Sequence, residues 1–178
     1  MHVLFVCTGN ICRSPMAERL AAAYCAALQV PNFTVSSAGT RAVVAHSIHH
    51  DAALILTRLG GEASNFAARQ LTSRMASDAD LVLTMTRAHR RTALELAPHK
   101  LHRTFTLSEA SRLASDCNAR TIADLAALRS QLVAQEPSDI PDPSGQSAEF
   151  FAMVGVQISN LLPPILDLCR HASPVATD

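Results

Sequence analysis

The sequence has no tryptophan, a single tyrosine and no excess of either charge. Lysine and arginine number 15, as do aspartate and glutamate, so the chain lacks the basic surplus that nonspecific nucleic-acid binding requires. No stretch reaches the roughly 18 apolar residues that span a bilayer. The first residues also lack the basic segment, apolar core and cleavage site of a secretion signal. We therefore expect no nucleic-acid partner and no membrane association.

The sequence also lacks the cysteine patterns of disulfide frameworks and zinc sites. Its five cysteines are odd in number and irregularly spaced, and none forms a Cys-x2-Cys pair. This usage fits a reducing compartment, so we expect a cytoplasmic protein. His46, His49 and His50 stand close together, but only Asp51 is at hand to complete a closed metal site. We expect neither a metal nor another cofactor.

Apolar runs and helix-like segments alternate along the chain. Predicted strands lie at 3–6, 33–36, 80–85 and 103–106, and predicted helices at 15–28, 48–59, 87–97, 108–115, 121–135 and 147–162. This alternation predicts an α/β fold, a parallel sheet with helices on both faces, as one three-layer domain over residues 1–170. Pro163 and Pro164 should end or kink the last helix near Leu162. Residues 171–178 are expected to form a disordered tail.

The most informative segment is residues 7–14, Cys-Thr-Gly-Asn-Ile-Cys-Arg-Ser, between the first strand and a helix that begins near Pro15. Backbone N–H groups at a helix N-terminus bind anions, and an arc of successive N–H groups forms an anion nest. Gly9 and Asn10 permit the left-handed backbone that such a loop needs. The segment predicts a phosphate cradle formed by Thr8, Gly9, Asn10, Ile11, Cys12, Arg13 and Ser14.

The side chains of the segment point to the same chemistry. Arg13 carries a planar, permanently charged fork that can grip two phosphate oxygens. The positive surroundings favour Cys7 as a thiolate nucleophile. Ser14 can cap the helix and offer its hydroxyl to the sulfur. The alternative interpretation, a cysteine packed as a small apolar side chain beside an unrelated arginine, explains fewer of these features.

At this point the chain resembles the low-molecular-weight protein tyrosine phosphatases of bacterial type. The resemblance rests on residues 3–20, VLFVCTGNICRSPMAERL, on residues 36–40, SSAGT, and on Asp142-Pro143 in the late loop. It implies a sheet in strand order 2-1-3-4 and hydrolysis of phosphate monoesters through a phosphocysteine, without metal. It also implies a tyrosine-phosphorylated protein or a small phosphate ester as substrate. We expect a monomer.

Cleavage of a phosphate ester needs a proton for the leaving group, and a carboxylic acid can supply it. Asp142 is the candidate because the family's acid also sits in an Asp-Pro pair on a late loop, and Asp139 is the competitor. The resemblance suggests that Ser37 supports the loop through Asn10, although a strand-end turn residue would look the same. It also suggests that Cys12 captures oxidised Cys7 as a disulfide; a buried packing residue is the alternative.

Other functions remain open. Related proteins on this scaffold reduce arsenate through later cysteines, for which Cys117 is the only mid-chain candidate. Some bacterial relatives hydrolyse phosphoarginine and carry a small polar residue where this chain has Ile11, so Ile11 predicts a preference for phosphotyrosine.

Residues 42–44 and 144–145 lack the aromatic side chains that wall the family's cleft. A phosphate-binding module without catalysis needs neither Cys7 nor Asp142. The helix at 87–97, with three arginines and His89, is interpreted as a solvated face, and weak steering of anionic substrates is the alternative.

Overall fold

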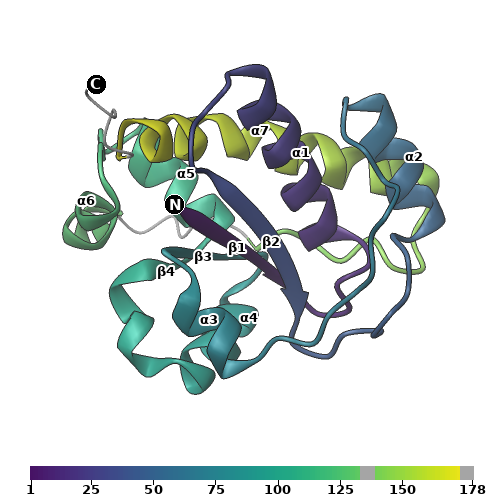
Figure 1. The fold of residues 1–178 in the computed structure, drawn as a ribbon, viewed down its shortest axis with the longest axis horizontal. Helices are drawn as coiled ribbons and strands as arrows, with labels where there is room; N and C mark the ends of the chain where they lie inside the picture. The colour runs from purple at the N-terminus through teal and green to yellow at the C-terminus, as the bar shows by residue number, and fades with distance from the viewer. Residues whose placement is uncertain (133–138, 173–178) are drawn as a thin grey trace.

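The computed structural model describes residues 1–132 and 139–172, which form one parallel sheet flanked by helices (Figure 1). The strands are β1 (His2–Cys7), β2 (Thr34–Gly39), β3 (Leu81–Thr84) and β4 (Thr104–Thr106). They lie in the order β2-β1-β3-β4, and every pairing is parallel. The predicted fold class and strand order are therefore confirmed.

The helices follow the strands in sequence and lie on both faces of the sheet (Figure 1). They are α1 (Arg13–Ala27), α2 (His50–Arg58), α3 (Ser73–Asp78), α4 (Arg87–Leu96), α5 (Leu107–Ser115), α6 (Ile122–Ala127) and α7 (Ala148–Ala172). Two short 3-10 helices, η1 (Pro98–Arg103) and η2 (Arg129–Gln131), complete the described elements.

Alternating side chains of β1 divide the interior into two layers. Val3 and Phe5 join the larger core, which α1, α2, α5 and α7 complete. Leu4 and Val6 point to the other face and pack with residues of α3 and α4. All four side chains are fully buried. The end of β1, where residues 7–14 begin, is thus held from both faces of the sheet.

Several elements differ from the prediction. Strand β2 continues to Gly39, beyond the predicted end at 36, because its polar residues pair in register with β1 as far as Cys7. Helix α3 was missed, since it has only six residues and begins at a Thr72 cap rather than at an apolar pattern. The predicted helix at 121–135 is shorter: α6 ends at Ala127 and η2 follows, while residues 133–135 lie outside the described part.

The prediction that Pro163 and Pro164 end or kink the last helix near Leu162 is wrong as to the end, because α7 continues to Ala172. Each proline removes a helical hydrogen bond at a cost of about 3 kcal/mol. Beyond them, however, Ile165, Leu166, Leu168 and Cys169 are buried in the larger core. Burying one large aliphatic side chain contributes about 1.5–3 kcal/mol, so packing outweighs the prolines. Residues 173–178 of the predicted tail lie outside the described part.

The uninterrupted α7 is also long and apolar enough, by length and composition alone, to cross a membrane over residues 148–170. No such stretch was expected, because no run in the sequence reaches roughly 18 apolar residues. Helices in the core of a globular domain pass the same test. Phe151, Val154 and Ile158 lie in the larger core and are at most 1% exposed, which identifies α7 as a core helix of this domain.

Candidate active site

Residues 7–14 connect β1 to α1, and Asn10 makes the tight turn possible. Its φ of +55° lies in the left-handed region, which asparagine tolerates better than most side chains. Gly9, for which the sequence predicted the same region, does not adopt it. A methyl group at Gly9 would meet Ile11 and Val43 at ordinary contact distances of 3.5 and 3.6 Å. The turn therefore depends on Asn10.

A second segment, residues 40–49, orients the backbone of this loop. Its N–H groups donate to the loop carbonyls, Thr40 to Cys7 at 2.9 Å, Arg41 to Thr8 at 3.0 Å, Val43 to Gly9 at 2.9 Å and His49 to Ile11 at 2.7 Å. In a planar trans peptide the carbonyl and the following N–H point in opposite directions. The N–H groups of residues 8, 9, 10 and 12 therefore face the inside of the loop. There they can bind an anion at the N-terminus of α1.

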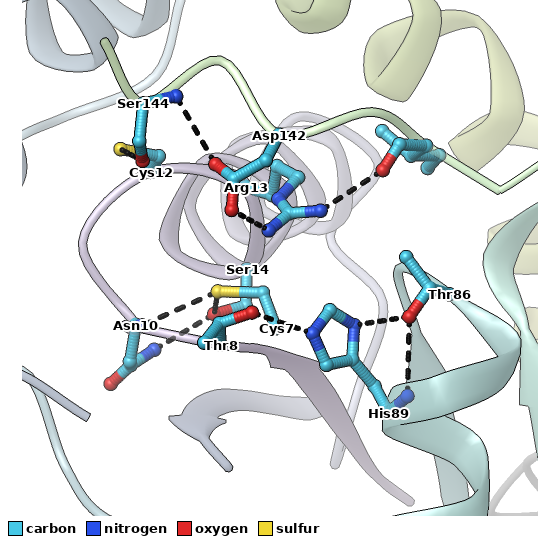
Figure 2. Close-up of polar contacts among 11 residues, drawn as sticks. Cys7, Thr8, Asn10, Cys12, Arg13, Ser14, Thr86, His89, Asp142 and Ser144 are labelled. Atoms are coloured by element: carbon cyan, nitrogen blue, oxygen red, sulfur yellow. Dashed lines mark hydrogen bonds and ion pairs between the residues drawn. The ribbon is translucent and has the colours of Figure 1, made fainter. Parts of the chain in front are cut away.

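The Cys7 sulfur lies inside this loop (Figure 2). The residue is 2% exposed, and its Sγ is 3.3 Å from the backbone nitrogen of Asn10, which donates to it. Ser14 Oγ is 3.0 Å from the same sulfur. A thiolate accepts both hydrogen bonds at once, and the thiolate is the nucleophilic form of cysteine.

The predicted helix cap by Ser14 is wrong. The N-cap residue of α1 is Cys12, and no side chain makes a hydrogen bond at that cap. Ser14 Oγ instead accepts a hydrogen bond from Asn10 Nδ2 at 2.9 Å. Its own hydrogen can go to the Cys7 sulfur at 3.0 Å or to the more distant Ala38 carbonyl at 3.5 Å, and the contact with the sulfur is the one that the sequence also predicted.

The side chain of Asn10 is completely buried, and its amide is held from both ends. Nδ2 donates to Ser37 Oγ at 2.8 Å, and Oδ1 accepts from the backbone N–H of Arg69 at 2.7 Å. Ser37 donates in turn to Glu18 at 2.5 Å. The expected contact between Ser37 and Asn10 is therefore present. Glu18 and Arg69 extend the network, and no sequence signal distinguished them.

Gly39 is required by a close approach of β2 to the loop. A Cβ at this position would lie 2.4 Å from the carbonyl oxygen of Thr8 and 3.0 Å from the backbone nitrogen of Asn10. Both neighbours are backbone atoms of the loop, so they cannot move aside without deforming it. The sequence marked residues 36–40 as a motif, and this contact gives the physical reason for its glycine.

Arg13 lies above the same loop and is 4% exposed. Its Nη1 donates to the Ile140 carbonyl at 3.0 Å, and its Nη2 pairs with Asp142 Oδ2 at 2.5 Å (Figure 2). Its buried Nε has no acceptor within residues 1–132 and 139–172. A buried donor without a partner is costly, and an oxyanion in the loop can supply the acceptor.

The structure separates the two candidate acids. Asp142 pairs with Arg13, accepts from the backbone N–H of Ser144 at 3.1 Å and has a side chain that is 47% exposed. Asp139 is packed in space against the N-terminus of α4, where its Oδ1 accepts a hydrogen bond from the backbone N–H of Arg87 at 2.9 Å. Asp142 lines the same cavity as Cys7, and Asp139 is not among its lining residues. The geometry therefore favours Asp142.

A cavity of about 220 Å³ opens above the loop. Its floor is formed by the loop itself, and its walls by Ile11, Arg41, Val43, Asp142 and Ser144. Ile11 and Val43 are apolar, whereas Arg41 is an exposed cation at the rim that sequence reasoning did not single out. The cavity can therefore hold an anion at its base and an apolar group between its walls.

Cys12 lines this cavity together with Cys7. It is 4% exposed, and its Sγ lies 3.9 Å from Ser144 Oγ. Burial raises the pKa of Cys12 to about 11, although the hydrogen bond from Ser144 opposes the shift. Cys12 is therefore a neutral thiol near pH 7. Its capture of oxidised Cys7 stays a prediction.

Residues 2–124 match the family model for low molecular weight phosphotyrosine protein phosphatases. The chain belongs to this family. Its members are cysteine-dependent phosphatases, so the match agrees with a loop that presents Cys7 beneath Arg13.

Similar proteins extend the match over most of the phosphatase chain. A Klebsiella pneumoniae protein that carries the family name is 32% identical over 152 residues, which cover 85% of each chain. The solved AmsI tyrosine phosphatase of Erwinia amylovora is 28% identical with a TM-score of 0.71, over 93% of this chain and 91% of that one. The YwlE arginine phosphatase of Geobacillus stearothermophilus is 29% identical with a TM-score of 0.72, over 93% and 90%.

The predicted solvated face on α4 of this phosphatase is wrong for His89 and for Arg90, whose half-buried side chain donates from Nε to the Thr104 carbonyl at 2.9 Å. His89 is only 7% exposed and lies between Thr8 of the loop and Thr86. The contact joins residues 81 positions apart, which helical periodicity could not reveal.

The remaining candidates lie apart from the phosphatase loop or have another role. His49 accepts a hydrogen bond from the backbone N–H of Asp51 at 3.3 Å and stacks on Phe151. No three His, Cys, Asp or Glu side chains gather as a metal site would require, within the ranges described. Cys117 follows the end of α5, and its neighbours Ala114 and Ala119 line a cavity with residues 164–170 of α7. That half of α7 contacts the end of α1, away from Cys7.

Proposed function

We propose that this protein is a protein-tyrosine phosphatase that hydrolyses phosphate monoesters through a phosphocysteine at Cys7. The observation that supports this most strongly is the Cys7 sulfur, enclosed by a loop whose inward N–H groups and Arg13 provide binding for an oxyanion. A module that only binds phosphate needs no sulfur at the centre of that loop.

The reaction has two steps. In the first, Cys7 attacks phosphorus, and the bond to the ester oxygen breaks while Asp142 donates a proton to the leaving oxygen. In the second, Asp142 accepts a proton from water, which attacks the phosphocysteine, releases phosphate and restores the thiolate. Arg13 and the loop N–H groups stabilise the equatorial oxygens in both steps.

The walls of the cavity favour phosphotyrosine over other phosphorylated side chains. Ile11 and Val43 provide apolar contact for the aromatic ring of phosphotyrosine. The guanidinium of phosphoarginine would need a carboxylate partner. Among the described wall residues only Asp142 carries one, and it is already paired with Arg13. The tyrosine phosphatase AmsI among the solved relatives supports this choice. We infer a tyrosine-phosphorylated protein or a small aryl phosphate as substrate and a monomer as the working unit. Five free cysteines support a reducing cytoplasm.

Phosphoarginine is the second candidate substrate, because a solved relative is an arginine phosphatase of the same fold. The two substrates share the phosphate cradle and differ at the walls, so the ratio of their kcat/KM values separates them. Arsenate reduction is less favoured, because the structure does not bring Cys117 to Cys7.

The proposed function is tested with p-nitrophenyl phosphate. We expect turnover that a chelator does not reduce. The Cys7→Ser variant should lose turnover while still binding inorganic phosphate, because a serine hydroxyl does not ionise near neutral pH. If Cys7→Ser keeps more than a few per cent of the parent rate, Cys7 is not the nucleophile.

A further inference from the structure

His89 of α4 is held by threonine hydroxyl groups at both ring nitrogens. Its Nε2 is 2.8 Å from Thr8 Oγ1, and its Nδ1 is 2.9 Å from Thr86 Oγ1. Figure 2 shows the ring facing Thr8, the residue that follows Cys7 in the loop. This connects α4 directly to the floor of the cavity, although His89 itself does not line it.

The imidazole is neutral under ordinary conditions. Burial lowers the pKa of His89 to about 4, and the nearby charge of Arg13 acts in the same direction, while Asp142 and Asp139 oppose it. Of the two nitrogens of a neutral imidazole, one donates a hydrogen bond and the other accepts one. The neighbours then decide which nitrogen carries the proton.

The hydrogen bonds of Thr86 indicate which ring nitrogen of His89 carries the proton. Its Oγ1 already accepts the backbone N–H of His89 at 3.1 Å, as the N-cap of α4. Its own hydroxyl hydrogen needs an acceptor, and Nδ1 of His89 is the one recorded for it within the described residues. A proton on Nδ1 would leave that hydroxyl hydrogen without a recorded acceptor. These contacts favour a proton on Nε2, which would then donate to Thr8.

The Thr8 hydroxyl is oriented by its contact with His89. Because Oγ1 of Thr8 accepts from His89, its own hydrogen is directed elsewhere. In the described ranges that hydroxyl has no other recorded partner, and Thr8 lines the cavity beside Cys7. A phosphate oxygen in the cavity would be a charged acceptor for this hydrogen.

We propose that His89 is a positioning residue that orients the Thr8 hydroxyl as a hydrogen-bond donor to the bound phosphoryl group. The proposal rests on the proposed phosphatase function. A hydrogen bond to a charged group commonly changes equilibrium or rate constants by about 10- to 100-fold, which sets the size of the expected effect.

The test combines side-chain variants with a measurement on the parent. His89→Leu removes both ring contacts and should lower kcat/KM for p-nitrophenyl phosphate by about 10- to 100-fold, and weaken binding of inorganic phosphate about 10-fold. His89→Gln can accept from Thr86 through its carbonyl and donate to Thr8 through its amide, so it should recover most of the loss. Thr8→Val should lose as much as His89→Leu, and the double variant little more than either.

Nitrogen-15 NMR of the parent at pH 7 reads the proton position without relying on turnover or on a variant that folds. We expect a neutral ring with the proton on Nε2. The proposal would be overturned by an NMR spectrum that shows a proton on Nδ1 or a charged ring. It would also be overturned by equal losses of kcat/KM in His89→Leu and His89→Gln, or by additive losses in the double variant. If the parent showed the expected ring and phosphate affinities but no ester hydrolysis, the proposed function would fail while the positioning role stood.

Discussion

Replacing Asp142 by asparagine removes the acidic proton and leaves a side chain of nearly the same size in its place. Asp142 uses Oδ2 to pair with Arg13 and Oδ1 to accept from the backbone N–H of Ser144, so the single amide oxygen in Asp142→Asn would keep one of these two contacts. The amide could not donate an acidic proton. Removal of a general acid lowers turnover by about 10²–10⁴-fold, and we expect kcat for phenyl phosphate to fall within that range.

The ion pair with Arg13 cannot account for a loss of this size. The side chain of Asp142 is 47% exposed, and a pair with one partner so exposed is worth at most about 1 kcal/mol, less than a tenfold effect. The loss should also depend on the leaving group. Aryl phosphates that leave as stable phenolates need no proton, so their kcat/KM, which reports the first step, should fall far less than that of phenyl phosphate.

The matched control is Asp139→Asn, three positions earlier in the same loop. Because Asp139 binds the start of α4 rather than the cavity, its variant should keep turnover within about threefold of the parent. Steady-state rates across a series of aryl phosphates make the comparison. A larger loss in Asp139→Asn, or a loss in Asp142→Asn that is the same for every leaving group, would refute the assignment of the acid.

Three further predictions concern stability, oxidation and specificity. His89 has a pKa of about 4 in the folded protein and 6.5 in the unfolded chain, so the unfolded chain binds more protons between these pH values. The free energy of unfolding should therefore fall by up to roughly 3 kcal/mol from pH 6.5 to pH 4. Urea unfolding of His89→Gln should lack that part of the fall. Mild peroxide should inactivate reversibly through a Cys7–Cys12 disulfide detected by mass spectrometry. Its formation should quicken from pH 7 to 9, because the thiolate fraction of Cys12 grows toward its pKa of about 11; absence of the linkage would exclude this route. Ile11→Thr should shift the kcat/KM ratio toward phosphoarginine by ~1–3 kcal/mol, and an unchanged ratio would show that Ile11 does not set specificity.

The sequence predicted the parts of the site that are local. Residues 7–14 lie on one strand-to-helix connection, so the chemistry of Cys7 and Arg13 could be inferred from spacing alone. Asp142 was found through the family resemblance, because 129 positions separate it from Arg13. Strand order came from the same source, since periodicity predicts strands but not their neighbours.

The contacts that sequence reasoning missed are made between distant segments. Gly39 approaches the loop only because β2 pairs with β1, and His89 reaches Thr8 only because α4 packs beside the end of the sheet. Arg41 borders the cavity because residues 40–49 fold back on the loop. The run of α7 through Pro163 was missed for a related reason, because tertiary burial outweighs a local helix breaker.

The central claim is that the phosphoryl group passes through Cys7, and trapping it there is the most direct test. In Asp142→Asn an activated aryl phosphate should still transfer its phosphoryl group, while hydrolysis should slow for want of the base. Rapid acid quenching followed by peptide mass spectrometry should then find one phosphoryl group per chain, on Cys7, together with a matching burst of phenolate. A phosphoryl group on another residue, or steady turnover with neither burst nor modified Cys7, would contradict the account.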